Sequence, residues 1–237
     1  MKTRGKKTCL KSGKAPKVAG VIAGSIGKRA IEKAKKDGAD LIEVRLDTLR
    51  ERDPERLKGD FKKKLRPAGL PILLTIRSRK EGGRYAIGDR ERLALFREII
   101  PFADAVDIEL GSKKIIGEVI KTARGHRKTV IVSYHNFRTT PRTQTLERII
   151  KDARRRGADA VKIATLAKTR EHILRLIGVL PGHRDMIAVA MGRYGRMSRV
   201  VFPFLGSLVT YGAITETTAP GQFTLKELKK ALSFFNG

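Results

Sequence analysis

Lys162 is the residue of this sequence with the clearest potential for chemistry. It lies in the middle of a short apolar run, Gly157–Leu166, that has the length and composition of a buried strand, and no carboxylate follows it there. Burial of an ammonium group in apolar surroundings disfavours its charged form, and the free amine is a nucleophile for carbonyl groups. His135 ends the run Val130–His135 in the same way, and histidine carries protons near neutral pH. Together the two residues predict covalent chemistry on a carbonyl compound.

The composition is that of one large domain without a membrane segment. The chain has 237 residues, of which 41% are hydrophobic, so one sizeable core can form. No stretch approaches the roughly 18 apolar residues that a membrane-spanning helix needs, and the N-terminus lacks the apolar segment of a secretory signal. We therefore expect a cytoplasmic protein. Cys9 is the only cysteine, which excludes a disulfide within the chain and a cysteine-based metal cluster.

The formal net charge of +28 could indicate a nucleic-acid-binding protein, so its distribution matters. Residues 1–17 contain seven basic residues and no acidic one, and we expect residues 1–16 to be a disordered basic leader. Runs such as Lys62–Lys64 and Arg154–Arg156 fit the solvated outer faces of helices. Aromatic residues make up only 5% and are not interleaved with basic residues as base stacking requires. An anionic substrate fits the charge as well, and nucleic-acid binding is expected only as an incidental effect.

From residue 17 onward, short β-rich runs alternate with longer amphipathic stretches, which is the pattern of repeated βα units. Strands are predicted near residues 18–23, 40–46, 71–77, 104–110, 128–135, 159–165, 186–191 and 207–214. Helices are predicted near residues 26–37, 54–65, 90–101, 113–124, 144–156, 169–178, 197–203 and 224–235. Asp53-Pro54 favours a helix start, and Gly38 and Gly157 favour helix ends. Pro203 is expected to limit the seventh helix to a turn or two.

Eight successive βα units predict a single-domain (β/α)₈ TIM barrel over residues 17–237, with an open, doubly wound sheet as the alternative. Because strand side chains alternate between faces, ionisable residues recur on one face near the carboxyl ends of strands two to six. In a barrel that face points inward, and the carboxyl ends form the mouth where such enzymes carry their active sites. The residues that would converge there are Glu43, Arg45, Arg77, His135 and Lys162. An internal layer of salt bridges is the structural alternative, with Glu43 paired to Arg45 or Arg77.

Several short motifs follow one another along the predicted barrel. They are Glu43-Val44-Arg45-Leu46-Asp47, Thr75-Ile76-Arg77-Ser78 with Glu81-Gly82-Gly83, Ser133-Tyr134-His135-Asn136-Phe137, Val161-Lys162-Ile163-Ala164, Met191-Gly192 with Ser198-Arg199, and Ala219-Pro220-Gly221-Gln222. In order and spacing they resemble the type I 3-dehydroquinate dehydratases, the imine-forming enzymes of the shikimate pathway of aromatic amino acid biosynthesis. The resemblance covers essentially all of residues 17–237.

The resemblance implies that Lys162 forms a Schiff base with the C3 ketone of 3-dehydroquinate and that His135 moves the protons of a syn dehydration to 3-dehydroshikimate. Glu81 resembles an acidic residue that acts beside the histidine. The residues implied in substrate binding are Glu43 at the hydroxyl groups, Arg45 and Arg77 around the ring, Arg199 at the carboxylate, and Thr218 and Gln222 on a closing loop. The resemblance further implies no metal and no organic cofactor, and a homodimer. Thr218 stands where the family pattern has serine.

Two other functions stay open at this point. Gly192, Gly195, Ser198 and Arg199 follow the seventh strand, where many barrels bind phosphate, so an aldolase acting on a sugar phosphate could use Lys162 as well. A nucleic-acid-associated protein, with the barrel as a scaffold, would explain the basic leader.

Overall fold

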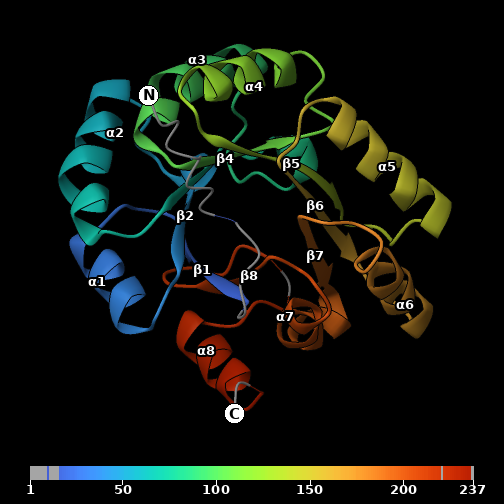
Figure 1. The fold of residues 1–237 in the computed structure, drawn as a ribbon. Coiled ribbons are helices and arrows are strands. Elements are labelled where there is room, and N and C mark those ends of the chain that lie inside the picture. The colour runs from blue at the N-terminus through green and yellow to red at the C-terminus, as the bar shows by residue number, and fades with distance from the viewer. Residues whose placement is uncertain (1–9, 11–15, 220, 236–237) are drawn as a thin grey trace, which may run out of the picture.

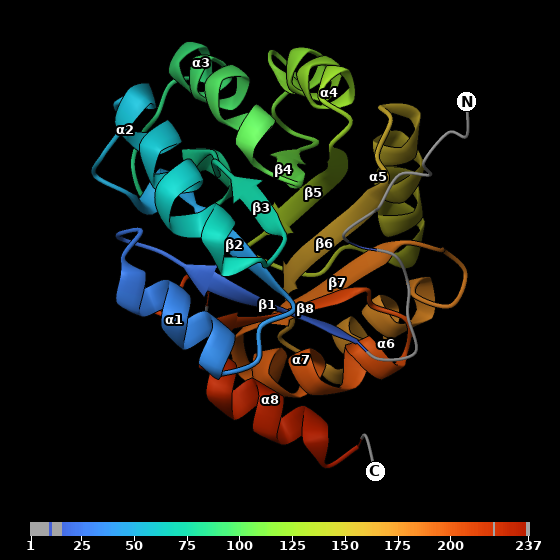
Figure 2. The same ribbon diagram turned by 60° about the vertical axis from the view of Figure 1, so that its left-hand side comes forward.

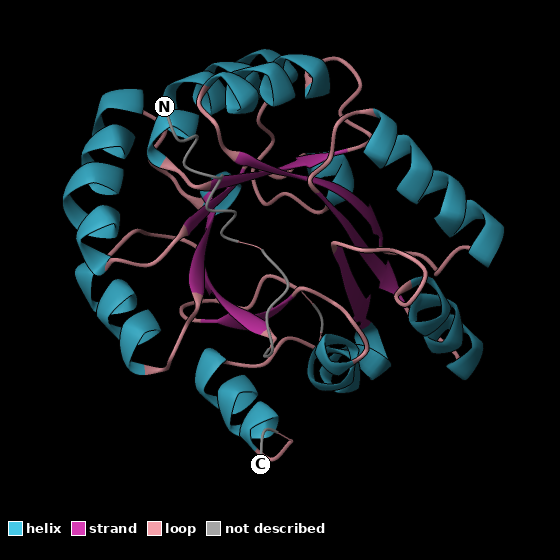
Figure 3. Cartoon of the chain, viewed as in Figure 1, coloured by secondary structure: helices cyan, strands magenta, loops and turns pink. Residues whose placement is uncertain are grey.

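The computed structural model describes residues 10, 16–219 and 221–235, and in these residues eight parallel strands alternate with eight α-helices. The strands are β1 (Lys17–Ile22), β2 (Leu41–Arg45), β3 (Ile72–Thr75), β4 (Ala105–Glu109), β5 (Thr129–Asn136), β6 (Ala160–Leu166), β7 (Met186–Met191) and β8 (Val209–Ala213). The helices are α1 (Lys28–Lys36), α2 (Pro54–Asp60), α3 (Asp89–Ile99), α4 (Ile116–Gly125), α5 (Thr143–Arg155), α6 (Arg170–Val179), α7 (Gly195–Phe204) and α8 (Leu225–Ser233). The strands form a ring that the helices surround, which confirms the predicted (β/α)₈ barrel (Figures 1 and 3).

The sheet closes on itself. Each strand from β1 to β6 pairs in parallel with the next along the chain, and β1 also pairs with β8, with Lys17 opposite Val209. Between β7 and β8 the contact is a single bridge from Met186 to Ser207, and the Leu208 N–H donates to the Met186 carbonyl at 2.8 Å. A view turned by 60° again shows the helices outside the strands (Figure 2). The open, doubly wound alternative is therefore wrong, since its first and last strands would not pair.

Local signals set the element boundaries much as the sequence indicated. The side chain of Asp53 accepts a hydrogen bond from the Arg56 N–H at 2.8 Å and caps α2, with Pro54 in the first turn. Gly38 follows α1 with a positive φ of 80°, which glycine adopts without strain. Helix α2 continues as a π-helical turn over Phe61–Leu65, so the predicted helical stretch is present in full.

Helix α7 is longer than expected, because a side chain from β8 compensates for its proline. Pro203 lies inside the helix and lacks the N–H that would bond the carbonyl of Arg199, four residues earlier. The Thr210 hydroxyl donates to that carbonyl instead, at 2.8 Å. The helix therefore runs through the proline to Phe204, and the prediction of only one or two turns was wrong.

The inner face of the barrel changes from apolar to polar along the strands. Leu41, Leu73 and Ile131 belong to a buried cluster inside the barrel, and each is followed two residues later by a polar residue on the same face. Leu10 is buried in the same apolar cluster. Residues 1–9 and 11–15 lie outside the described residues, so the disordered leader stays a prediction. Within the described part of the chain, no helix is long and apolar enough to cross a membrane.

Candidate active site

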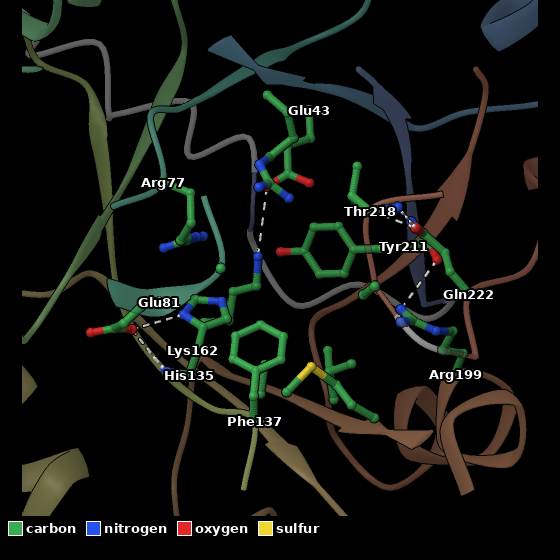
Figure 4. A pocket seen from close by; sticks show the side chains of 16 residues that line it. Glu43, Arg77, Glu81, His135, Phe137, Lys162, Arg199, Tyr211, Thr218 and Gln222 are labelled. Atoms are coloured by element: carbon green, nitrogen blue, oxygen red, sulfur yellow. Dashed lines mark hydrogen bonds and ion pairs between the residues drawn. The ribbon is translucent and has the colours of Figure 1, made fainter. Parts of the chain in front are cut away.

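A cavity opens at the carboxyl ends of the strands and contains all nine residues that the sequence singled out. It is lined by Glu43, Arg45, Arg77, Glu81, Gly82, His135, Phe137, Lys162, Ala164, Val189, Met191, Arg199, Tyr211, Thr218, Ala219 and Gln222 (Figure 4). Because parallel strands end at the same rim, residues from β2, from β5 through β8, from α7 and from the loops after β3, β5 and β8 can face one space. The convergence expected at the barrel mouth is therefore present, while the roles of the individual residues are taken up as proposals below.

Lys162 lies on the inner face of β6 with its amine among charged groups. Its Nζ is 3.2 Å from Oδ2 of Asp107 and 3.6 Å from Oε1 of Glu43, and it lies 4.1 Å from the ring centroid of Tyr211. The side chain is only 7% exposed. The expectation of apolar surroundings was wrong, because the two carboxylates come from β2 and β4 and are distant along the chain. Lys162 is thus a buried amine that two carboxylates and an aromatic face hold in one place.

Arg77 connects the amine to a layer of buried acids. Its guanidinium donates to both oxygens of Asp107, at 2.9 and 2.8 Å, and to Glu109 at 3.1 Å. Burial disfavours the charge on Asp107, but Arg77 and then Lys162 outweigh it and hold the pKa of that carboxyl well below its usual range. The sequence had suggested Glu43 as the partner of an arginine, but Glu43 accepts a hydrogen bond from Thr75 at 2.8 Å. Internal salt bridges therefore exist, with other partners than predicted.

Arg45 also lines the cavity and is paired with the carboxylate of Asp47. It binds Asp47 through two hydrogen bonds of 2.9 Å each, and Asp47 is completely buried. Asp47 also accepts from the backbone N–H of Arg77 at 3.0 Å. One buried carboxylate thereby fixes the ends of β2 and β3 relative to each other, and it keeps the Arg45 guanidinium at the wall of the cavity.

His135 and Glu81 form a hydrogen-bonded pair on one wall. Nδ1 of His135 is 3.0 Å from Oε2 of Glu81, and the same oxygen accepts the backbone N–H of His135 at 2.9 Å. Glu81 is presented by a tight turn in which the Gly83 N–H donates to the Ser78 carbonyl at 2.8 Å. A Cβ on Gly83 would lie 2.2 Å from the carbonyl oxygen of Arg77, so only glycine fits this turn.

The electrostatics of this pair leave the histidine neutral near pH 7. Burial, the charge of Arg77 and that of Lys162 all lower the pKa of His135 well below its ordinary value. Burial and the nearby charge of Glu109 raise the pKa of Glu81 from 4.5 to about 7. A neutral imidazole with one nitrogen on a carboxyl group that titrates near pH 7 can accept and return a proton at its other nitrogen.

Arg199 forms the opposite side of the cavity and has no carboxylate partner among the described residues. Its Nε donates to the Gly221 carbonyl at 3.2 Å and its Nη1 to the Tyr211 carbonyl at 3.4 Å, whereas Nη2 is buried without a hydrogen-bond partner. Burial lowers the pKa of Arg199 to about 10, so the side chain is still a cation at neutral pH. An unpaired buried cation at a cavity wall favours an anionic ligand.

The loop after β8 completes the rim. Oε1 of Gln222 accepts the backbone N–H of Thr218 at 2.7 Å and its hydroxyl at 3.3 Å, so the two predicted loop residues bind each other. Val189, Met191 and Phe137 add an apolar wall. The cavity therefore offers charged groups at two sides and apolar contacts between them, a combination that suits a small organic acid.

The glycine-rich segment after β7 is used for packing, which argues against a phosphate site. The hydroxyl of Ser198 is buried and hydrogen-bonded to the backbone of Ala190 and Gly195, at 3.1 and 2.9 Å. Ser198 therefore has little capacity left for a phosphate. This weakens the aldolase alternative.

Sequence reasoning missed three buried residues that hold the site together. Asp107 lies on the inner face of β4 and was not predicted as the partner of Lys162. Tyr211 and Arg92 were not singled out, although Arg92 is 1% exposed and donates to Glu109 at 2.5 Å. The run Ala105-Val106-Asp107 carried a signal for Asp107, because an acidic residue in an apolar strand needs a cationic partner. The helical period carried a signal for Arg92, which lies three, four and seven residues before Leu95, Phe96 and Ile99 and shares their buried face.

Comparison with known proteins gives a consistent result. Residues 26–237 match the family model described as type I 3-dehydroquinase. A 3-dehydroquinate dehydratase of Methanosarcina barkeri is 41% identical over 210 residues, which cover 84% of this chain and 87% of the relative. A 3-dehydroquinate dehydratase of Pyrococcus abyssi is 38% identical and covers 90% of this chain and 94% of its own.

Solved structures of 3-dehydroquinate dehydratases superpose on this chain over most of its length. The 3-dehydroquinate dehydratase of Aquifex aeolicus superposes with a TM-score of 0.83 at 31% identity, over 92% of this chain and 98% of that protein. The type I 3-dehydroquinate dehydratase of Clostridium difficile, solved with covalent modified comenic acid, gives a TM-score of 0.84 at 29% identity, over 93% of this chain and 92% of that protein.

Proposed function

Because the chain belongs to the type I 3-dehydroquinase family, we propose that it dehydrates 3-dehydroquinate to 3-dehydroshikimate through an imine formed on Lys162. The observation that carries the proposal is the meeting of three groups in one cavity. They are a buried lysine amine, a neutral histidine paired with Glu81, and a buried arginine without a carboxylate partner. A keto acid needs all three: an amine for the ketone, a proton carrier, and a cation for the carboxylate.

The first step would be attack of the Lys162 amine on the C3 ketone. The carbinolamine that forms loses water and leaves a protonated imine, and His135 supplies and removes the protons. The imine then withdraws electrons from C2. The neutral imidazole of His135 would remove a proton from C2. The hydrogen bond between its Nδ1 and Glu81 would keep the other ring nitrogen directed toward the substrate.

The second step would be loss of the C1 hydroxyl. As the C2 electrons form the new double bond to C1, the C–O bond breaks, and His135 returns its proton to the leaving oxygen to give water. Hydrolysis of the imine restores the Lys162 amine and releases the product. One acid–base group suffices because the proton taken from C2 is the one that leaves with the hydroxyl.

Arg199 would hold the substrate carboxylate, since its Nη2 is a donor that none of the described residues pairs. Glu43, Arg45 and Arg77 would contact the hydroxyl groups and the ring from the walls of β2 and β3. Thr218 and Gln222 would close over the ligand from the loop after β8. The covalent ligand of the Clostridium difficile relative supports a covalent mechanism in the family.

Borohydride reduction tests the proposal. Sodium borohydride added with 3-dehydroquinate should reduce the imine and attach the ligand to one peptide, which mass mapping should identify as the one with Lys162. Lys162→Ala should give no adduct and no turnover. Asp107 keeps its bonds to Arg77 and Ser133, so this variant should still fold. Lys151→Ala, which removes an exposed lysine of α5, is the matched control.

An adduct on another residue, or full turnover without any adduct, would contradict the imine mechanism. Near-normal turnover of Lys162→Ala would point to a non-covalent route. Loss of structure in that variant is checked by circular dichroism, and Lys162→Met then provides a variant that fills the space of the aliphatic side chain.

We further propose a cytoplasmic homodimer of the shikimate pathway. Support for a dimer comes from exposed aromatic side chains on α7 and at the end of α8: Phe204 and Phe235 lie with ring centroids 5.5 Å apart, and Phe234 is 76% exposed. Light scattering of the purified protein tests the dimer. Nucleic-acid binding, if measured, should be weak and should decrease steeply with salt, as expected from charge alone.

A further inference from the structure

Two buried polar atoms of the described residues have no hydrogen-bond partner, and both belong to the wall of the cavity. They are Nη2 of Arg199 and the hydroxyl oxygen of Tyr211. The substrate carboxylate accounts for the first under the proposed function. The second has no role in that mechanism.

An unpaired buried hydroxyl is unfavourable, because it has lost its bonds to water and gained none. The barrel interior otherwise satisfies its hydroxyl groups: Thr75 donates to Glu43 at 2.8 Å, and Ser133 donates to Asp107 at 2.6 Å. Phenylalanine at position 211 would fill the same space without an unpaired polar atom. Among the described residues no group bonds the Tyr211 hydroxyl, so a ligand oxygen that bonds it would add a hydrogen bond that the protein itself does not supply.

The position of Tyr211 fits a contact with the ligand. It lies on β8, and its side chain is 4% exposed. Its ring extends from the side of Arg199 and Gln222 toward the Lys162 amine, which is 4.1 Å from the ring centroid (Figure 4). A small acid that joins its ketone carbon to Lys162 and its carboxylate to Arg199 would pass beside this ring.

The hydroxyl is also in the right protonation state. Burial, and next the charge of Glu43, raise the pKa of Tyr211 well above its ordinary value. The group is therefore a neutral phenol near pH 7, and it can donate one hydrogen bond and accept others.

We propose that the Tyr211 hydroxyl hydrogen-bonds an oxygen atom of the bound substrate beside the imine-forming amine and thereby selects for an oxygenated carbocyclic acid. The identity of this substrate rests on the proposed function. The hydroxyl takes no part in bond making or breaking, so Tyr211 is a positioning and specificity residue. A site built to bond an oxygen rejects a ligand that lacks it more strongly than an apolar wall does.

Tyr211→Phe tests the proposal, because it keeps the ring next to Lys162 and removes only the hydroxyl. The probe is quinate, which has the carboxylate and hydroxyl groups of the substrate but no ketone and forms no imine. Calorimetry should show quinate binding about 3- to 10-fold weaker in the variant, the range of one hydrogen bond. The kcat/KM for 3-dehydroquinate should fall by a similar factor. The ligand-free variant should unfold in urea at a midpoint equal to or above that of the wild type.

Tyr134→Phe is the matched control. The Tyr134 hydroxyl accepts a hydrogen bond from Nδ2 of Asn136 at 3.1 Å, and Tyr134 does not line the cavity. Its loss should lower the unfolding midpoint slightly and leave quinate affinity unchanged. If the Tyr211 hydroxyl were merely structural, Tyr211→Phe would show the same pattern as this control.

Wild-type quinate affinity in Tyr211→Phe would overturn the role of Tyr211, and a lower unfolding midpoint of the ligand-free variant beside it would show that the hydroxyl is only structural. Borohydride trapping separates this failure from failure of the proposed function. Wild-type protein that traps 3-dehydroquinate on Lys162 while Tyr211→Phe binds quinate normally would refute only the role of Tyr211. Wild-type protein that neither traps the substrate nor binds quinate would refute both.

Discussion

Replacement of Glu81 by glutamine should stabilise the protein at pH 8 and leave its stability at pH 5 near that of the wild type. Burial and Glu109 raise the pKa of Glu81 from 4.5 to about 7 in the folded protein. In the unfolded chain the carboxyl ionises near its ordinary value. Between these two pH values the unfolded state has lost a proton that the folded state keeps, so the free energy of unfolding falls as pH rises through this window.

The size of the effect follows from the pKa values. At about 1.4 kcal/mol per pKa unit, ionisation of Glu81 above pH 7 costs the folded state about 3 kcal/mol. Glutamine never ionises and avoids this cost. It keeps an oxygen for the backbone N–H of His135 but bonds the imidazole less well, a loss of about 1 kcal/mol. The net gain at pH 8 should be about 2 kcal/mol, or about 4–8 °C in the thermal midpoint of a chain of this size.

Urea unfolding of the wild type and Glu81→Gln at pH 5 and pH 8 measures this directly. At pH 5 the carboxyl of the folded wild type is protonated and resembles the amide. All other groups titrate in both proteins, so their contributions largely cancel when the stability difference between the two proteins at pH 8 is compared with that at pH 5. Glu32→Gln, at an exposed position on α1, controls for the loss of one negative charge. A Glu81→Gln variant that is destabilised equally at both pH values would show that Glu81 ionises readily when folded. The proton balance of the His135–Glu81 pair would then be wrong.

His135→Ala should lower kcat by about 100-fold or more, which is the contribution of one general acid–base group, while KM changes little. Unchanged steady-state kinetics would remove His135 from the mechanism. Arg92→Lys should destabilise the protein by about 3 kcal/mol in urea unfolding, because a lysine cannot bond Glu109, Ser112 and the Ile76 carbonyl together as the guanidinium does. A loss below about 1 kcal/mol would contradict that account. Thr218→Ser should keep kcat/KM within about twofold, since its hydroxyl still reaches Gln222, and a larger change would show that the methyl group affects loop closure.

The barrel and the list of cavity residues could be predicted because both depend on short-range spacing. Glu43 and Arg45, or Ser133 and His135, are two residues apart and must share a face of a strand. The order of strands in a closed parallel barrel then brings every such face to the same interior. The position of a residue along its strand also decides how deep it lies inside the barrel. Leu41 precedes Glu43 and lies deeper, in the apolar cluster of the interior.

The pairing of charges inside the barrel could not be predicted in this way. Lys162 reaches Asp107 on β4 and Glu43 on β2, although β5 is its direct neighbour toward them in the sheet. Contacts across the interior depend on side-chain length and on the tilt of the strands, and neither is written in residue spacing. Thr210 was missed for a different reason, because its bond to the Arg199 carbonyl, which lets α7 continue past Pro203, joins a strand to the helix that covers it.

The distribution of unsatisfied groups points to the ligand independently of family membership. Arg45, Arg77 and Lys162 each have a carboxylate partner at 2.8–3.2 Å. Among the described residues Arg199 has only backbone carbonyls as partners, although a cation that leaves water loses several kcal/mol of solvation. Protein folding alone gives no reason to keep such a cation beside an unpaired phenol. A ligand that brings a carboxylate to one and an oxygen to the other would supply both missing partners and would stabilise the folded state in proportion to ln(1 + [L]/Kd), so the cost in the free protein reappears as affinity.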